Sequence, residues 1–133
     1  MTFKEFCSQL EEKIKSSYTE GTTQDEAEKL AAEFLHAQIE VSHELKKSAL
    51  DARMRKSGVK AVRASAYLDI VKAADKKPTE TQIESMINTD SLVAKEQDGL
   101  DKSEVERDEF ERYYSIFREA HIYYRGLSKG RFE

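Results

Sequence analysis

The sequence contains no tryptophan, one proline, one cysteine and only five glycines in 133 residues. So few prolines and glycines leave few places where a helix could break. A single cysteine, Cys7, excludes an internal disulfide, and its apolar neighbours Phe3, Phe6 and Leu10 predict a buried structural thiol. No apolar run approaches the ~20 residues of a membrane span, and the N-terminus lacks the pattern of a signal peptide. We therefore expect a cytoplasmic protein with no contact to a membrane.

Charge is abundant but unevenly distributed. Charged residues make up 36% of the chain, and the net charge is −4. Residues 46–77 hold ten basic side chains and three acids, a net of +7, which leaves −11 for the rest. Such an asymmetry indicates a segment that binds a polyanion, and a solvated helix face is the ordinary alternative.

Apolar residues recur at intervals of three and four throughout, which predicts an all-α fold. Thr2 with Glu5, and Thr79 with Gln82, have the spacing of capping boxes, and Ser57-Gly58 is the predicted break in a long central helix. Gly99 is a predicted bend in the last helix. The predicted helices cover residues 3–16, 24–56, 59–74, a short stretch after Thr79, and about 91–126.

These helices predict one domain, 1–133, built as a helical hairpin or bundle of long amphipathic helices. On the central helix the predicted apolar face includes Leu35, Ile39 and Leu50, and it becomes poorer in large side chains beyond Leu45. The aromatic residues from Phe110 to Tyr124 are predicted to pack rather than to form a binding platform. Because such a polar chain buries little apolar surface by itself, we expect self-association.

The sequence shows no catalytic apparatus, so we predict neither an enzyme nor a cofactor. Two Glu-x-x-His motifs, Glu33–His36 and Glu40–His43, are typical of di-iron bundles, but both lie on one helix, opposite its apolar face. We therefore predict no metal site, and a metal-dependent bundle enzyme remains an alternative. His121 has no nucleophile or orienting acid in reach. There is no phosphate-binding glycine loop and no zinc-ligand pattern.

The basic segment is the strongest functional candidate. Its cations have few acids among them and are spread round the helix axis, an arrangement that destabilises itself unless anions approach. Near the C-terminus, cations again alternate with aromatic rings, the combination that binds single strands by phosphate neutralisation and base stacking. The candidate nucleic-acid-binding residues are Lys46, Lys47, Arg53, Arg55, Lys56, Lys60 and Arg63, with Arg118, Arg125, Lys129 and Arg131 as a secondary set.

The order Lys46-Lys47-Ser48-Ala49-Leu50-Asp51-Ala52-Arg53-Met54, followed by Ser57-Gly58, resembles the DNA-binding stretch of the UvsY-type recombination mediators of T4-like bacteriophages. That stretch has the order Lys-Lys-x-Ala-Leu-x-Ala-Arg-apolar and ends in Ser-Gly. The layout of the rest of the chain and its length are also similar. Where the family has aromatic residues after the Arg-apolar pair, this sequence has Arg55-Lys56.

The resemblance implies a protein that binds single-stranded DNA and helps to load a RecA-like recombinase onto DNA covered by single-strand-binding protein. It also implies a ring-shaped homo-oligomer, a heptamer in the family, that acts in the bacterial host cell. Tyr67 or the C-terminal rings would then have to supply base stacking. The alternative is a helical protein-interaction module, such as a phage adaptor or an inhibitor of a host protein, that binds no nucleic acid.

Overall fold

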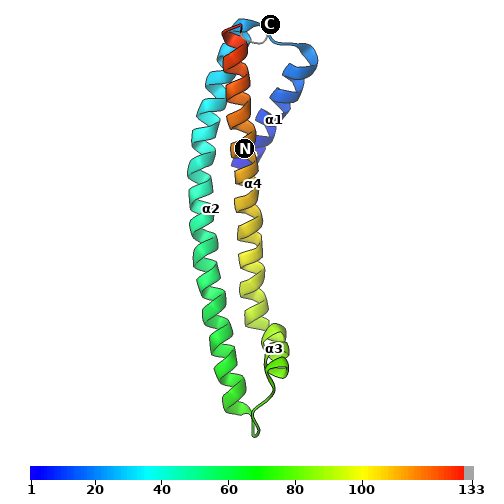
Figure 1. Ribbon diagram of the computed structural model, residues 1–133, viewed down its shortest axis with the longest axis vertical. Helices are drawn as coiled ribbons and strands as arrows, with labels where there is room; N and C mark the ends of the chain where they lie inside the picture. The colour runs from blue at the N-terminus through cyan, green and yellow to red at the C-terminus, as the bar shows by residue number, and fades with distance from the viewer. Residues whose placement is uncertain (131–133) are drawn as a thin grey trace. The chain divides into compact units, whose positions relative to one another are not determined.

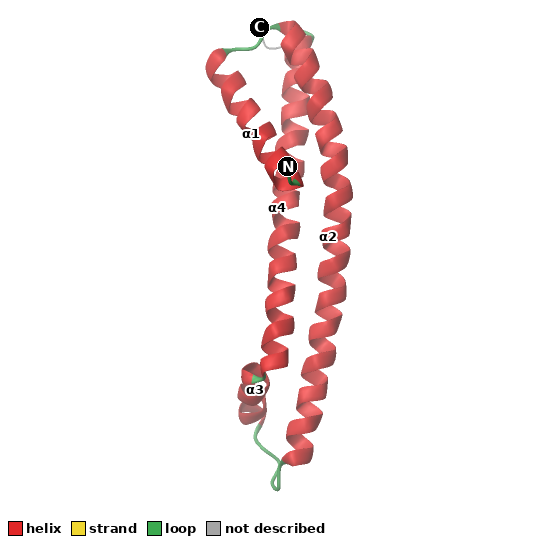
Figure 2. Ribbon diagram, turned by 180° about the vertical axis from the view of Figure 1, so that it is seen from behind, coloured by secondary structure: helices red, strands yellow, loops and turns green. Residues whose placement is uncertain are grey.

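The computed structural model describes residues 1–130, and within them the chain forms four α-helices and no strand (Figures 1 and 2). The prediction of an all-α fold is confirmed. The helices are α1 (Phe3–Glu20), α2 (Gln24–Ala73), α3 (Glu80–Thr89) and α4 (Ser91–Ser128).

The predicted break at Ser57-Gly58 is wrong, because α2 continues through both residues to Ala73. A helix-interior glycine costs only about 1 kcal/mol relative to alanine, which buried residues on both sides can offset. Ala52, Val59 and Ala66 are such residues, and they keep the same face of α2 buried across Gly58. Helix α4 passes through Gly99 without interruption.

The predicted caps are confirmed. Thr2 with Glu5, and Thr79 with Gln82, form complete capping boxes at the starts of α1 and α3. The Asp90 carboxylate accepts hydrogen bonds from the backbone N–H groups of Leu92 and Val93 at the start of α4. Helix α1 extends to Glu20, past the predicted end at Ser16, and ends at Gly21, whose φ of 85° few residues other than glycine adopt.

The chain divides into two compact units, to which both α2 and α4 contribute: unit 1 comprises Met1–Leu45 and the chain from Asp108, and unit 2 comprises Lys46–Arg107. In α2 the division follows Leu45, where the sequence predicts that the apolar face becomes poorer. Each unit has its own cluster of buried residues.

Unit 1 has an aromatic core. The Phe34 ring stacks on Tyr124 at a centroid distance of 5.7 Å and tilts against Phe117 at 5.6 Å. Helix α1 adds Phe3, whose ring lies 5.7 Å from that of Phe110. The predicted packing role of these aromatics is thereby confirmed. Cys7 is buried as predicted, and burial, with a smaller contribution from Glu109, raises the pKa of its thiol to about 11.

Helix α2 buries a narrower stripe than the sequence predicts. The buried positions recur at intervals of three, four and seven, close to the heptad spacing of a coiled-coil seam. Leu35, Ile39 and Leu50 lie beside this seam and are 43%, 48% and 56% exposed, so their assignment to the buried face is wrong. Buried residues of the seam include Ala27, Ala31, Phe34, Val41, Ser48, Ala52, Val59 and Ala66.

Unit 2 has a smaller apolar core, formed by α3 with the end of α2 and the start of α4. Its buried members are Ala66, Ile83, Ile87 and Val93, and Tyr67 packs against them half-buried. Beyond the buried Val59 and Leu100, the remaining buried residues of the helix pair are small, namely Ser48, Ala52 and Ser103. Because these buried residues are small, long side chains on either side of them can reach the space between α2 and α4.

Candidate nucleic-acid interface

Five of the seven primary candidates lie on one flank of α2. In a single unbroken helix, Lys46, Arg53, Lys56, Lys60 and Arg63 fall within an arc of about 100°. Lys47 and Arg55 project outside it, about 100° and 180° from Lys46. The expectation that the cations are spread round the axis is therefore replaced by a largely one-sided arrangement. Because Ser57-Gly58 does not break the helix, Lys60 and Arg63 continue the flank that the earlier cations begin.

Four of these cations form what we call the basic row: Lys46, Arg53, Lys56 and Lys60. All four are exposed. Lys46, Arg53 and Lys60 follow one another at seven-residue intervals, about 10.5 Å along the axis each, so the row spans about 21 Å. Within residues 1–130 none of the four forms an ion pair or a side-chain hydrogen bond. The row therefore presents positive charge that the described chain does not neutralise.

Arg55 and Arg63 are held by other residues of unit 2. The Nε of Arg55 donates to the Asp51 carboxylate at 3.0 Å, and the Ser103 hydroxyl donates to the same carboxylate. These two hydrogen bonds, with that of Ser103 the larger cause, lower the pKa of Asp51. Arg63 donates to Glu84 at 2.5 Å and to Asn88 at 3.1 Å, both on α3. These two arginines support the helix packing of unit 2.

Two grooves run between α2 and α4 in unit 2, one on each flank of α2, and their charges differ. The groove beside the basic row, with a volume of about 320 Å³, has three cations and one acid at its rim, lined by Ala49, Ala52, Arg53, Lys56, Glu104 and Arg107. The groove on the other flank, about 430 Å³, has mixed charge, lined by Asp51, Arg55, Lys95, Glu96, Asp98, Gly99, Lys102, Ser103 and Glu106. Positive charge is thus concentrated on one side of this helix pair.

The secondary candidates lie in unit 1. Arg118 and Arg125 are exposed on α4, Lys129 is exposed in the turn that follows it, and Arg131 lies outside the described residues. Tyr124 is only 1% exposed, so it cannot stack on a base. Tyr123 is half-exposed and packs edge-on against Tyr124 at 5.3 Å.

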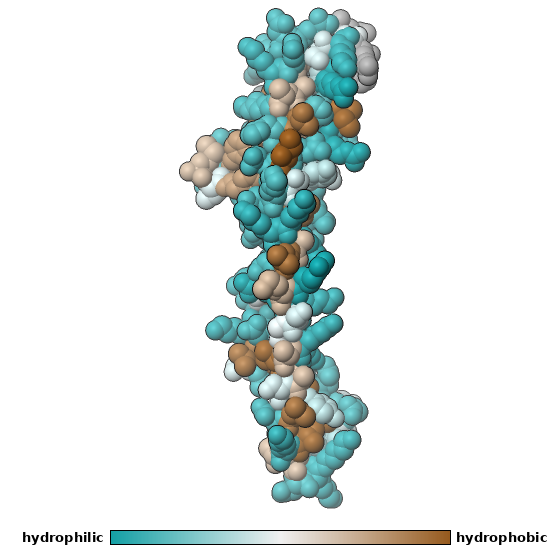
Figure 3. Space-filling view, turned by 90° about the vertical axis from the view of Figure 1, so that its left-hand side faces the viewer, coloured by the Kyte–Doolittle hydropathy of each residue, from teal (hydrophilic) through white to brown (hydrophobic). Residues whose placement is uncertain are grey.

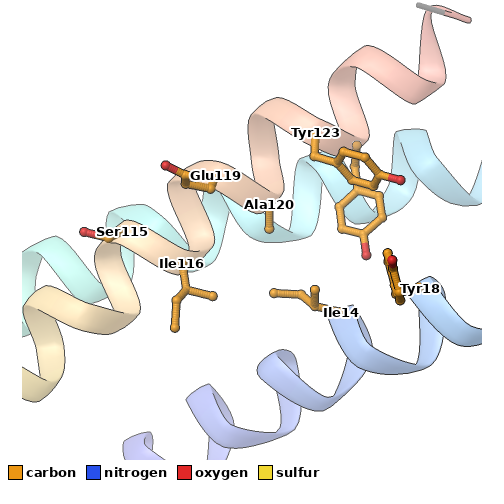
Figure 4. A pocket seen from close by; sticks show the side chains of 8 residues that line it. Ile14, Tyr18, Ser115, Ile116, Glu119, Ala120 and Tyr123 are labelled. Atoms are coloured by element: carbon orange, nitrogen blue, oxygen red, sulfur yellow. The ribbon is translucent and has the colours of Figure 1, made fainter. Parts of the chain in front are cut away.

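Tyr123 also lines an apolar groove of about 500 Å³ between α1 and α4 of unit 1. Figure 4 shows Ile14 and Tyr18 of α1 facing Ile116 and Tyr123 of α4 across this space. Tyr18 is 88% exposed. The groove therefore offers a concave apolar surface to a partner.

The two Glu-x-x-His motifs do not converge on a common centre. His36 and His43 are exposed, as predicted, and Glu33 instead binds Lys13 at 2.5 Å. His121 Nδ1 lies 2.9 Å from the carbonyl oxygen of Ala31, which makes it a packing residue. Over residues 1–130 no three His, Cys, Asp or Glu side chains gather as metal ligands.

Comparison with protein-family models, curated proteins and solved structures finds no match. Any assignment of function to this chain therefore depends on its own residues. In the part of the chain that the structure describes, no helix has both the length and the apolar character to cross a membrane.

Arg107 also lines the groove beside the basic row, although it is not among the candidates predicted from the sequence. It lies on α4, 44 positions after Arg63, outside the basic segment, and acids surround it in the sequence (Glu104, Glu106 and Asp108). A signal was present, because Leu100, Arg107 and Tyr114 recur at seven-residue intervals on the face of α4 that meets α2. That spacing places the Arg107 side chain beside the seam, within reach of the α2 flank.

Proposed function

We propose that this protein binds single-stranded DNA along the basic row and acts as a recombination mediator. The observation that carries the proposal is the row itself: four exposed cations on one flank of α2 over about 21 Å, without partners among residues 1–130. Consecutive phosphates of one strand would neutralise them. No base-reading residues are required, so binding would be independent of DNA sequence.

Binding by one copy of the chain would be weak and sensitive to salt. Four phosphate contacts to a single strand correspond to a log–log salt slope of about −2.8, a loss of about 50-fold between 50 and 200 mM salt. Several copies in one homo-oligomer would present several basic rows to one strand, and avidity would then supply the affinity. The heptameric ring implied by the family resemblance is one such assembly.

Exposed apolar residues support self-association. The outer face of α2 in unit 2 carries an uncharged stripe, and its large members Leu50, Met54 and Leu68 are 56%, 66% and 54% exposed. Figure 3 shows apolar side chains exposed along the face that α2 covers. The stripe has large residues at both ends and the small residues Ser57, Ala61 and Ala64 between them. This pattern reads nearly the same in both directions, so the stripe suits contact with the same stripe of an antiparallel second copy. Such a contact would form a dimer, whereas a heptameric ring needs a head-to-tail contact. The mass of the protein in solution distinguishes the dimer from the ring.

In this proposal the protein has no catalytic step. Its partners are single-stranded DNA, a RecA-like recombinase and the single-strand-binding protein that covers the DNA, and it works in the cytoplasm of a bacterial host. Weak, multivalent contacts suit a mediator, because they can be exchanged along a strand while the recombinase assembles.

The decisive experiment measures binding of a fluorescent oligo-dT at 50 and 200 mM salt together with the solution mass. We expect binding that weakens steeply with salt and a mass above that of one chain. A double variant, R53A/K60A, should lose at least tenfold in affinity with unchanged helicity. The matched control, K95A/K102A, removes the same charge from α4 on the other flank and should bind almost like the wild type. Absent or salt-insensitive binding by the wild type would exclude the proposal.

The apolar groove of unit 1 favours a second candidate, a helical protein-interaction module. Ile14, Tyr18, Ile116 and Tyr123 together form the kind of surface on which an amphipathic helix docks. This candidate predicts a stoichiometric complex with one protein partner in the absence of DNA. The variant Ile116→Glu should abolish that complex and leave oligo-dT binding unaltered.

A further inference from the structure

The groove beside the basic row is lined by cations from two helices. Arg53 and Lys56 reach it from α2, and Arg107 reaches it from α4. Its other α2 residues, Ala49 and Ala52, are too small to fill it. The sequence therefore leaves a groove that three cationic side chains line, while the basic row by itself is a line of separate charges on a convex helix.

We infer that this groove is a phosphodiester-binding subsite in which Arg107 clamps a DNA phosphate against Arg53 and Lys56. This inference rests on the proposed function and adds a residue from a second helix to it. A guanidinium can give a phosphate two parallel hydrogen bonds, which fix its orientation as well as its charge. The strand then lies in the α2–α4 groove of unit 2, and the outer face of α2 stays open.

The charged residues around Arg107 influence how tightly its guanidinium can bind an anion. Arg107 forms an ion pair with Glu104, with 3.8 Å between the guanidinium and the carboxylate, and the two side chains are 32% and 43% exposed. An ion pair at this separation and exposure is weak. A phosphate in the groove would compete with Glu104 for the Arg107 guanidinium, and the Glu104 carboxylate would oppose its approach.

The size of the groove fits this ligand. Its volume of about 320 Å³ is about ten times the ~30 Å³ that one water molecule occupies in the liquid. A phosphodiester with its two flanking sugars fits such a space. The absence of aromatic residues from the lining leaves nothing for a base to stack on, so the groove selects the backbone of the strand.

The test compares R107A with K102A in oligo-dT titrations of the full chain from 50 to 200 mM salt. Both variants lose one cation of α4, but Lys102 lies on the other flank and pairs with Asp98 at 2.9 Å. We expect R107A to bind about tenfold more weakly at 50 mM salt and to reduce the salt slope by about 0.7. K102A should change affinity less than twofold.

Two further variants separate binding from folding. R107K should recover part of the affinity, because it keeps the charge and loses the planar fork. E104Q, which removes the opposing charge, should bind about two- to threefold more tightly. Equal losses in R107A and K102A, or an unchanged E104Q, would overturn the inference while the proposed function stands. A wild type that binds no oligonucleotide would instead remove the proposed function itself.

Discussion

The Arg55 guanidinium lies directly over Gly99. A Cβ atom added to Gly99 would stand 2.7 Å from Nη1 of Arg55, closer than real contacts allow. Arg55 also donates to Asp51 at 3.0 Å, so its side chain is held within unit 2. Two positions earlier, Arg53 is exposed in the basic row and has no ion pair within residues 1–130. Two arginines of similar sequence context therefore have different surroundings.

The first prediction compares these two arginines. R53A should lower the affinity for oligo-dT about tenfold, because it removes a charge-assisted phosphate contact. R55A should lower it less than twofold, since that guanidinium already binds Asp51 and lies outside the row. Fluorescence anisotropy at 50 mM salt measures both. Equal losses would mean that only the total charge of the segment matters.

The second prediction concerns the continuous helix at Gly58. A Cβ atom there would meet Glu96 at an ordinary 3.6 Å, so G58A should stabilise the protein by about 0.5–1 kcal/mol in urea unfolding. The matched variant G21A should destabilise it by about 1 kcal/mol or more, because Gly21 has a φ of 85°. If G58A destabilises the protein, the helix is not continuous at this position.

The third prediction is a pH dependence at Asp51. The hydrogen bond from Ser103, and then Arg55, lowers the pKa of this carboxyl below its ordinary value of 3.8. A carboxyl with a lowered pKa stabilises the fold above pH 3.8, and that contribution is lost as the pH falls below it. The melting temperature of wild type should therefore exceed that of D51N at pH 6, and the gap should narrow towards pH 3. Asp75→Asn serves as a control for the lost charge. A gap that is constant from pH 6 to pH 3 would contradict this role.

The fourth prediction concerns the Cys7 thiol. Burial raises its pKa to about 11, so at pH 8.5 the thiol is neutral as well as inaccessible. Ellman's reagent should react with it in guanidinium chloride and hardly at all in the native protein. Because the pKa rises from 9.0 on folding, the thiol's contribution to stability is full below pH 9.0 and is lost as the pH approaches about 11. The variant Cys7→Ala should lack this alkaline loss, and rapid labelling of the native thiol would contradict its burial.

Local patterns made much of the fold predictable. A capping box needs only two residues three positions apart, so the starts of α1 and α3 could be placed from sequence. The break at Ser57-Gly58 could not be judged locally. Its weak helix propensity is outweighed by buried residues on both sides, Ala52 and Val59, whose burial depends on a helix far away in the chain.

The sequence by itself determined that the chain is helical and that positive charge gathers in residues 46–77. It also determined the packing of Cys7 and of the α4 aromatics Phe110, Tyr113, Phe117 and Tyr124. Periodicity, caps and composition are properties of neighbouring residues, which is why these points could be predicted. Only the tertiary structure decided which cations are available to a ligand. Asp51 and Ser103 lie 52 positions apart, and Arg63 and Glu84 lie 21 apart, yet their contacts separate the arginines that hold unit 2 together from those of the basic row. The groove that Arg107 lines together with Arg53 and Lys56 also depends on the tertiary structure, because it forms only where small residues of α2 face α4.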